Sequence, residues 1–352
     1  MSKIRHFAMT RTGSVFLVLS AAALGGNSLA QAEDFYKGKT ITMIVASGVG
    51  GGYDVYARAF ARHATKHIPG NPNIIAKNMP GAGGLIAANT LANTSPKDGT
   101  EIAALTNGVS MDPLFGVKTA KYDGRKLAWI GSIGKLQNVC ATWHTSKVKT
   151  IADARKGEIV TAAAGARSNT AIMPRIANDL LGTKFKVITG YSPNAGLNKA
   201  MEGGEAEAIC GLSWSTLKAS RPYWIKNKRL NYLVQFGLQK LPDLPDVPSA
   251  LDLITKPDDR KMLNIILVRQ EVGRPIAAAP GVPADRLAML RKAFDATMKD
   301  PAYLAEAKKL GQDVEPLTGA EIGKFLADVY ATPKPIVARA AALIRPPRKK
   351  KK

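Results

Sequence analysis

Short apolar segments rich in β-branched residues alternate along this chain with longer segments in which apolar residues recur at helical spacing. The first strand is predicted at residues 40–46, where the sequence reads TITMIVA, and a helix is predicted at 53–67 after a glycine cluster. The order repeats, with a strand at 73–77, a loop at 80–84 and a helix at 85–93. Strands that alternate with helices predict a mostly parallel sheet in each of two α/β domains.

The same alternation continues toward the C-terminus. Strands are predicted at 101–105, 127–133, 139–143, 158–163, 186–189, 207–210, 231–235 and 276–279. Helices are predicted at 170–181, 196–202, 215–227, 284–298, 301–310 and 318–331. Prolines recur every three residues at Pro242, Pro245 and Pro248. Because proline cannot continue a helix, the segment 241–248 is predicted to be extended.

The N-terminus has the layout of a secretory signal peptide. Three positive charges precede an apolar run of ten residues, Val15–Leu24, and small residues follow up to an Ala-Gln-Ala sequence that ends at Ala32. The apolar run is short, since a membrane-spanning helix needs about 20 residues. We therefore expect residues 1–32 to be removed after Ala32, which places the mature protein in the periplasm.

The composition is that of a globular protein. The 352 residues suffice for about two domains, and 45% are hydrophobic while 22% are charged, which rules out wholesale disorder. The net charge is +23, of which three charges lie in the signal peptide and six in the basic segment 345–352, so that +14 remains on the body. We expect the segment 345–352 to be a disordered tail that either solubilises the chain or tethers it to anionic lipid.

The sequence allows a disulfide between two cysteines and a metal site at two histidines, and it decides neither. Cys140 and Cys210 could form a disulfide in an oxidising compartment, or each could be a small buried apolar residue. His63 and His67 lie four residues apart on one face of a predicted helix, but no third ligand accompanies them, so a solvated pair is favoured over a metal site. We expect no metal and no cofactor.

Three glycine-rich loops follow predicted strands, at 47–54, 78–84 and 164–170. In open α/β sheets ligands bind beyond the carboxyl ends of the strands, where helix N-termini present unpaired N–H groups and a partial positive charge. Such helix ends favour anions. Each loop alone could be a tight turn, whereas three together favour a binding site.

Known nucleotide-binding and catalytic motifs do not fit the sequence. A dinucleotide fingerprint needs glycine at its first, third and sixth positions, but Tyr53 and Ile86 stand at the sixth position counted from Gly48 and Gly81. The G-x-S-x-G nucleophile elbow and the zinc-binding H-E-x-x-H motif are both absent. Apart from the pair described above, the mature chain has one histidine, His144, so general bases are few.

Five motifs occur in the same order as in one known family. They are GGGYDVYAR at 50–58, PGAGG at 80–84, DGT at 98–100, LPDLPDVP at 241–248 and APGVP at 279–283. The first resembles the G-G-x-x-D-x-x-A-R signature that follows the first strand of the substrate-binding proteins of tripartite tricarboxylate transporters (TctC or Bug proteins). The others are similar to the P-G-A-G-G, D-G-y-t, L-P-D-V-P and A-P-x-G-x-P motifs of that family.

The resemblance implies a type II periplasmic-binding-protein fold, in which two α/β lobes close on a ligand in the cleft between them. We expect residues 33–135 and 236–344 to form a first, discontinuous lobe and residues 136–235 to form the second. The family implies an extracytoplasmic solute-binding protein that captures a small organic anion and delivers it to the integral membrane permease subunits of the transporter. The anion would be a di- or tricarboxylate, an acidic amino acid or an aromatic carboxylate, and we expect a monomer.

In this family main-chain N–H groups and waters hold one carboxylate at the first loop and at the loop that opens the first helix of the second lobe. Carried over, these positions are Ser47, Gly48, Gly50, Gly51, Gly52, Asp54, Gly165, Ser168, Asn169 and Thr170. The chain departs from the family where Ala171 replaces a histidine and Arg167 is gained. We expect Arg167 to bind a carboxylate in bidentate fashion. We expect Asn107, Ser213 and Trp214, at later strand ends, to contact the rest of the ligand.

Two other functions are considered. An enzyme that acts on small carboxylates on the same scaffold, such as a hydrolase or an isomerase, is the alternative, and the missing catalytic motifs speak against it. A nucleic-acid or polyanion binder would explain the positive charge, but no aromatic platform or recognition motif supports it. The identity of the ligand and the cognate permease are not specified by the sequence.

Overall fold

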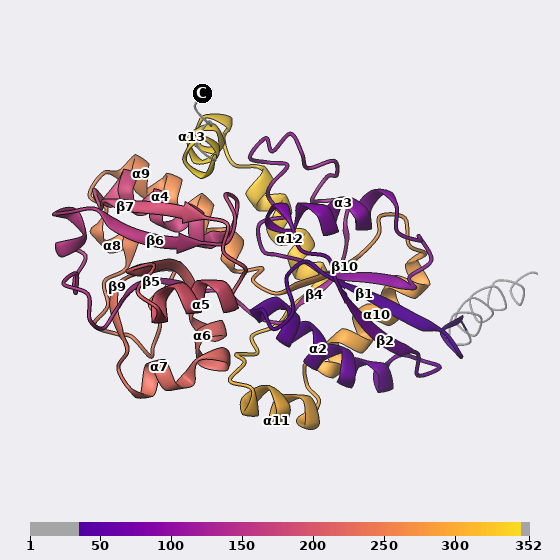
Figure 1. Cartoon of the computed structure of the whole chain (residues 1–352). Coiled ribbons are helices and arrows are strands. Elements are labelled where there is room, and N and C mark those ends of the chain that lie inside the picture. The colour runs from indigo at the N-terminus through magenta and orange to yellow at the C-terminus, as the bar shows by residue number, and fades with distance from the viewer. Residues whose placement is uncertain (1–34, 346–352) are drawn as a thin grey trace, which may run out of the picture.

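Two mixed β-sheets organise the chain, and each carries its own helices, so that two α/β lobes lie side by side (Figure 1). The computed structural model describes residues 35–345. The signal peptide predicted at 1–32 and most of the predicted tail at 345–352 lie outside the described residues. The α/β fold class with two lobes is confirmed.

The first lobe contains a six-stranded sheet with the strand order β11-β4-β10-β3-β1-β2. Its strands are β1 (Thr40–Val45), β2 (Asn73–Asn78), β3 (Glu101–Ala104), β4 (Ala128–Ser132), β10 (Pro275–Ala278) and β11 (Leu317–Thr318). Its helices are α2 (Gly52–Ala64), α3 (Leu85–Asn93), α10 (Ala284–Thr297), α11 (Pro301–Lys309) and α12 (Gly319–Tyr330). Helices α10 and α12 pack on β4, α3 packs on β3, and α2 packs on β1 and β2.

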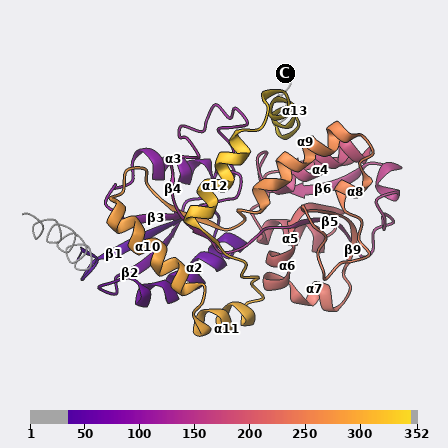
Figure 2. The same cartoon turned by 180° about the vertical axis from the view of Figure 1, so that it is seen from behind.

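The second lobe contains a five-stranded sheet with the strand order β7-β6-β8-β5-β9. Its strands are β5 (Asn138–Trp143), β6 (Ile159–Ala163), β7 (Phe185–Thr189), β8 (Ala208–Ser213) and β9 (Leu230–Phe236). The helices of this lobe are α4 (Asn169–Leu181), α5 (Ala195–Glu202), α6 (Trp214–Ser220), α7 (Pro222–Lys226), α8 (Ala250–Leu253) and α9 (Pro257–Leu267). The last helix, α13 (Lys334–Ile344), leaves the first lobe and packs on α9 and α4, as the view from behind also shows (Figure 2).

The expectation of mostly parallel sheets was wrong. In the first sheet β1 pairs in parallel with β2 and β3, but β10 pairs antiparallel with both β3 and β4. In the second sheet β6 pairs in parallel with β7 and β8, while β5 pairs antiparallel with β8 and β9. The antiparallel pairs of β5 and β10 arise where the chain crosses between lobes, because a strand that enters a sheet from the other lobe does not follow a right-handed crossover helix.

The helices differ from the prediction in two ways: one predicted helix is split at a proline, and three helices were not predicted. The single helix predicted at 215–227 is two helices, because Pro222 cannot continue α6 and instead begins α7. Helices α8, α9 and α13 were not predicted. Helix α9 carries recognisable signals, since Pro257 and two aspartates stand in its first turn and Met262 and Leu263 begin its buried face.

Two chain segments cross between the lobes side by side and form the hinge. The first joins β4 to β5 and the second precedes β10. The Leu136 N–H donates to the Gln270 carbonyl oxygen at 2.9 Å, and the Ile133 N–H donates to the Arg274 carbonyl oxygen at 3.1 Å. A Cβ atom at Gly273 would lie 2.5 Å from the Leu136 nitrogen, so glycine is required for this close approach. Because α8 and α9 pack on second-lobe elements, we propose a lobe boundary in this hinge, near residue 270, in place of 235.

The question that the sequence left open about the cysteines has a structural answer. Cys140 on β5 and Cys210 on β8 stand opposite each other in the antiparallel pairing, are both fully buried and are joined by a disulfide. The bridge links two central strands of the second sheet and encloses a segment with a sequence separation of 70 residues. It therefore constrains the unfolded chain over most of the second lobe.

Replacement of both cysteines by alanine (Cys140→Ala with Cys210→Ala) should lower the free energy of unfolding by about 4 kcal/mol, the chain-entropy value for a loop of this length. Urea denaturation of the double variant beside the wild type measures the loss. Denatured, unreduced wild type should show no free thiol toward an alkylating reagent, and a thiol that reacts would contradict the bridge.

Candidate functional site

The three glycine-rich loops lie where the two lobes meet. The loop before α2 reaches the start of α6, because a Cβ atom at Gly52 would lie 2.1 Å from Thr216 Oγ1. The loop before α3 reaches the loop before α4, because a Cβ atom at Gly83 would lie 3.1 Å from the Cβ atom of Arg167. These contacts join residues of different lobes. The glycines thus allow the lobes to close on each other with little space between their main chains.

The first loop is held in shape by the buried carboxylate of Asp54. It accepts hydrogen bonds from the Gly50 N–H at 2.9 Å, from Arg58 Nε at 2.9 Å and from Asn78 Nδ2 at 2.8 Å. Asn78 Nδ2 also donates to the Ser47 carbonyl oxygen at 2.9 Å. Burial favours the protonated carboxyl, but these hydrogen bonds outweigh it and hold the pKa of Asp54 below its ordinary value. Asp54 therefore positions the loop, and its oxygens are occupied within the first lobe.

Two helices begin at this junction without a side-chain cap. Helix α2 starts at Gly52 after Gly51, and helix α4 starts at Asn169 after Ser168, and neither preceding residue caps its helix. The Ser168 hydroxyl instead donates to the Gly165 carbonyl oxygen at 2.7 Å. Uncapped helix N-termini leave N–H groups free and carry a partial positive charge, which suits an anion.

Asn107 is hydrogen-bonded to Tyr53 in the first turn of α2. The Tyr53 hydroxyl donates to Asn107 Oδ1 at 3.2 Å and accepts from the Asn107 N–H at 3.1 Å. Burial raises the pKa of Tyr53, so its hydroxyl is neutral and remains a donor. The Asn107 Nδ2 atom is buried and has no partner among the described residues.

Arg167 bridges the lobes by pairing with a carboxylate of the protein. Its Nη2 atom lies 2.9 Å from Asp112 Oδ1, and Asp112 belongs to the segment after β3 in the first lobe. Burial raises the pKa of Asp112, although the nearby charge of Arg167 acts in the opposite direction. The Arg167 Nε atom is buried and has no partner in the described chain. The guanidinium predicted to bind a ligand carboxylate thus already holds one carboxylate group.

The two residues predicted at the end of β8 have different surroundings. Ser213 caps α6 by accepting from the Thr216 N–H at 3.3 Å. The Trp214 indole N–H donates to Asp243 Oδ2 at 2.7 Å, and its ring packs edge-on against Tyr232. Trp214 therefore faces the core of the second lobe and is not brought together with the other predicted residues.

Two buried arginines at the junction were not predicted. Arg269 Nη2 donates to Asn169 Oδ1 at 2.8 Å, which ties the hinge to the first turn of α4. Arg274 Nη2 lies within hydrogen-bond distance of Ser215 Oγ at 3.1 Å and of Thr216 Oγ1 at 3.0 Å. Both arginines are at most 3% exposed. Nothing in their sequence context distinguishes them from surface arginines, because the contacts that bury them come from residues far away in the chain.

The junction carries more buried positive charge than residues 35–345 neutralise there. Arg167, Arg269 and Arg274 meet there, and the carboxylate of Asp112 faces Arg167 and Arg269. Each of the three guanidinium groups has a buried Nε atom without a partner among residues 35–345. Burial of a charge costs several kcal/mol unless an opposite charge and hydrogen bonds compensate. The arrangement is therefore suited to hold an anion.

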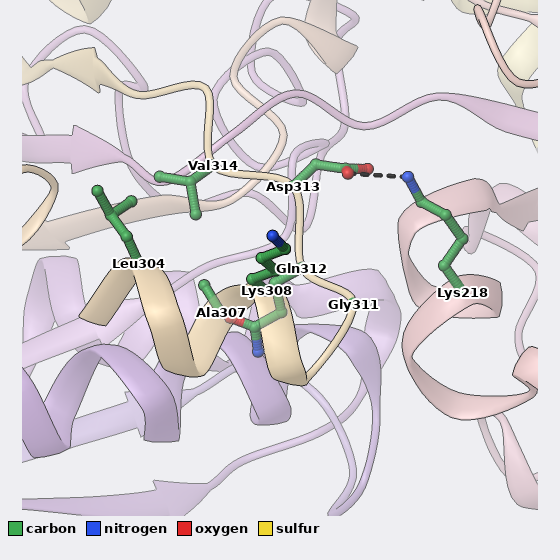
Figure 3. Close-up of a pocket in the computed structure, with 8 residues that line it drawn as sticks. All are labelled: Lys218, Leu304, Ala307, Lys308, Gly311, Gln312, Asp313 and Val314. Carbon is green, nitrogen blue, oxygen red and sulfur yellow. Dashed lines mark hydrogen bonds and ion pairs between the residues drawn. The ribbon is translucent and has the colours of Figure 1, made fainter. Parts of the chain in front are cut away.

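A cavity of about 290 Å³ lies between α6 of the second lobe and α11 with the segment that follows it in the first lobe (Figure 3). It is lined by Lys218, Leu304, Ala307, Lys308, Gly311, Gln312, Asp313 and Val314. Lys218 of α6 reaches across the lobes and pairs with Asp313 at 2.8 Å. A second cavity, of about 410 Å³, lies beside α2 and β2. Neither cavity is lined by a residue that the sequence predicted to bind the ligand.

Both histidines of the pair contact carboxylates of the protein. His63 Nε2 lies 2.6 Å from Glu306 and His67 Nε2 lies 3.1 Å from Asp300, so both rings fasten the end of α2 to the region of α11. Within residues 35–345 no group of three His, Cys, Asp or Glu side chains is placed to hold a metal ion. No helix in that range is long and apolar enough to cross a bilayer.

Comparison with known proteins gives one family. Residues 56–341 match the family described as the tripartite tricarboxylate transporter family receptor (TctC). A UPF0065 protein of Bordetella bronchiseptica is 26% identical over 302 residues, which cover 84% of this chain and 82% of that protein.

Solved structures show the same fold. A Rhodopseudomonas palustris protein solved with adipate has a TM-score of 0.68 and 17% identity, with 87% of this chain and 98% of that chain covered. MatC of Rhodopseudomonas palustris, solved with bound malate, has a TM-score of 0.64 and 17% identity, with 88% and 99% covered. With the motifs, the two closed lobes and the family match in agreement, this chain belongs to the TctC family of solute-binding proteins.

Proposed function

We propose that this protein captures a small organic anion between its two lobes and delivers it to the permease of a tripartite tricarboxylate transporter. The observation that carries the proposal is the excess of buried positive charge at the lobe junction, next to two uncapped helix N-termini. Two relatives in fold are solved with dicarboxylates, adipate and malate. A carboxylate would supply the acceptors that the junction lacks.

One carboxylate of the ligand is assigned to the main chain of the two uncapped helix ends. The N–H groups of Gly52, Asn169 and Thr170 lie in the first turns of α2 and α4, which belong to opposite lobes. The Gly51 N–H donates to the Gly48 carbonyl oxygen at 3.2 Å and supports the loop. An anion held by both turns would draw the lobes together, because each end carries a partial positive charge. Ser47, Gly48, Gly50, Gly165 and Ser168 would form the surrounding loops, with Asp54 as their support.

Location and partners follow from the family and from the N-terminal sequence. We propose that the protein is exported to the periplasm, that residues 1–32 are removed, and that it acts as a monomer that docks on the membrane permease. Catalysis on the same scaffold is the alternative. The family and its structural relatives are binding proteins, and a bound carboxylate that stays unchanged when followed by NMR would agree with them.

A screen of carboxylates against the mature protein tests the proposal by thermal unfolding. A ligand at 100 times its Kd should add about 2.7 kcal/mol to the free energy of unfolding, which raises Tm by several degrees. Neutral sugars of similar size serve as the control and should leave Tm unchanged. Stabilisation by sugars and by no carboxylate would contradict the proposal.

The substitution Gly52→Ala tests closure of the lobes. Its Cβ atom would meet the Thr216 side chain across the junction, while the N–H group of residue 52 is retained. Because overpacking costs about 1–3 kcal/mol, we expect the Kd for the best carboxylate of the screen to rise about tenfold or more with Tm of the free protein unchanged.

Two further variants control this result. Gly157→Ala, at an exposed glycine outside the junction whose Cβ atom would have no neighbour within 4 Å, should bind like the wild type. Adding Thr216→Ala to Gly52→Ala removes the two nearest atoms of the clash and should restore part of the affinity. Equal binding by Gly52→Ala and the wild type in isothermal titration calorimetry would show that the lobes do not close on the ligand in this way.

A further inference from the structure

Asn194 has a main-chain conformation that is rare for a residue with a side chain. Its φ is 58° and its ψ is −71°, close to the strained form of the γ-turn at about +75° and −65°. The Ala195 N–H closes the turn by donating to the Pro193 carbonyl oxygen at 2.8 Å. Such a conformation persists only where surrounding contacts hold it, and strain of this kind is concentrated at ligand clamps and switch regions. The turn therefore calls for a functional explanation.

The strained turn ends the segment 190–194, which joins β7 to α5 in the second lobe. At the start of this segment the Gly190 N–H donates to the carbonyl oxygens of Ala163 at 3.1 Å and Ala164 at 3.0 Å, where the glycine-rich loop before α4 begins. At its end the Asn194 carbonyl oxygen accepts from an N–H of α5 at 2.8 Å. The segment therefore borders the second-lobe loop whose helix end is proposed to hold the anion.

The side chain of Asn194 reaches the opposite lobe. Its Nδ2 atom donates to the Gly50 carbonyl oxygen at 3.5 Å, and it lies 3.1 Å from the position of a Cβ atom at Gly51. Both glycines belong to the first-lobe loop 47–54. The hydrogen bond is at the long end of the accepted range, so a small separation of the lobes breaks it. Main-chain strain and a contact between the lobes thus occur in one residue.

This contact lies on the solvent side of the junction. Val49, in the loop 47–54, is 78% exposed, and Pro193 is exposed as well. The hinge residue Arg274, by contrast, is 3% exposed. The segment 190–194 therefore meets the first-lobe loop at the outer rim of the junction, away from the hinge.

We infer that the segment 190–194 is a gate on the solvent side of the ligand cleft and that Asn194 is its latch. The inference rests on the proposed function, since the gate encloses the same anion. In the closed state the Asn194 amide holds the segment against the loop 47–54. The ligand between the two helix ends leaves only after this contact is broken, so the latch acts on release.

The strain in the turn determines which state the gate favours without a ligand. Once the lobes separate, Asn194 loses its contacts with Gly50 and Gly51, and the turn relaxes to an unstrained conformation. Closing has to restore the strain, which disfavours a closed gate in the ligand-free protein. The bound anion offsets this cost because it draws the two helix ends together. The amide contact slows release of the ligand and the strain accelerates it.

Stopped-flow measurement of ligand release tests the latch on the mature protein, with adipate and malate as probes and tryptophan fluorescence as the signal. Asn194→Ala removes the amide and keeps a Cβ atom on the strained residue. We expect its release rate constant to rise about threefold or more, the factor that corresponds to one neutral hydrogen bond. The association rate constant should stay within about twofold of wild type, because the latch forms after the ligand has entered.

Two further variants separate the amide from the strain. Asn194→Gly also lacks the amide, but glycine adopts a positive φ without strain, so its release should be accelerated less than that of Asn194→Ala. Asn71→Ala is the matched control. Asn71 also has a positive φ, of 46°, and it precedes the first residue of β2, whereas the glycine-rich loop follows the last. This control should leave both rate constants unchanged.

Hydrogen exchange of the ligand-free protein tests the gate without any ligand. The N–H group of Ala195 donates to the Pro193 carbonyl oxygen, and those of Gly196 and Leu197 donate to the Ser192 carbonyl oxygen. These three hydrogen bonds depend on the turn. We expect the three amides to exchange faster than the amides in the middle of α4, because the turn relaxes whenever the lobes separate.

The outcomes distinguish the gate from the proposed function. Release from Asn194→Ala at the wild-type rate would rule out the latch and leave the proposed function standing. Protection of residues 195–197 equal to that of α4 in the ligand-free protein would rule out the gate. Failure of the wild type to bind both adipate and malate would count against the proposed function, and hydrogen exchange would then decide the gate alone.

Discussion

Burial of the Arg274 guanidinium between the lobes is the constraint that explains most of the junction. A guanidinium at 3% exposure needs hydrogen-bond acceptors arranged around it before the lobes can close. The first turn of α6 meets part of this need, with three hydroxyl groups in the sequence Ser-Trp-Ser-Thr at 213–216. The rings of Tyr53 and Tyr56 on α2 meet another part. The Arg274 guanidinium still lacks a negatively charged partner, because no ion pair within residues 35–345 includes it.

The glycines of the loops have a second role beside the one that the sequence indicated. Glycine allows a main chain to approach an anion, and this was the reason to regard the three loops as binding loops. The structure shows that Gly52 and Gly83 also allow the lobes to approach each other, because each faces a side chain of the opposite lobe where a Cβ atom would not fit or would fit only tightly. Approach of the main chain to an anion and approach of the two lobes both require a residue without a side chain. A loop that reaches both the ligand and the other lobe can therefore respond to the ligand by closing.

Much of the local structure could be predicted from the sequence, and the junction could not. The ten predicted strands are all present, because apolar β-branched runs and the turns between them are local signals. The antiparallel insertion of β10 and the split at Pro222 depend on how distant segments meet or on a single residue within a periodic pattern. Arg269 and Arg274 are 100 and 58 positions away from Asn169 and Thr216, the partners that help to bury them. No periodicity or motif in a single sequence encodes such a contact.

The net charge of the chain also says little about how charge is arranged in the folded protein. The excess of +23 includes three charges on the predicted signal peptide and six on the predicted tail, and the remainder is distributed over the body. Most of those charges are solvated, and salt screens them. Arg269 and Arg274 are buried in a medium of lower dielectric, where an opposite charge a few ångströms away is attracted far more strongly than at the surface. The electrostatic potential inside the junction is therefore set more by where buried guanidinium groups lie than by the total charge of the chain.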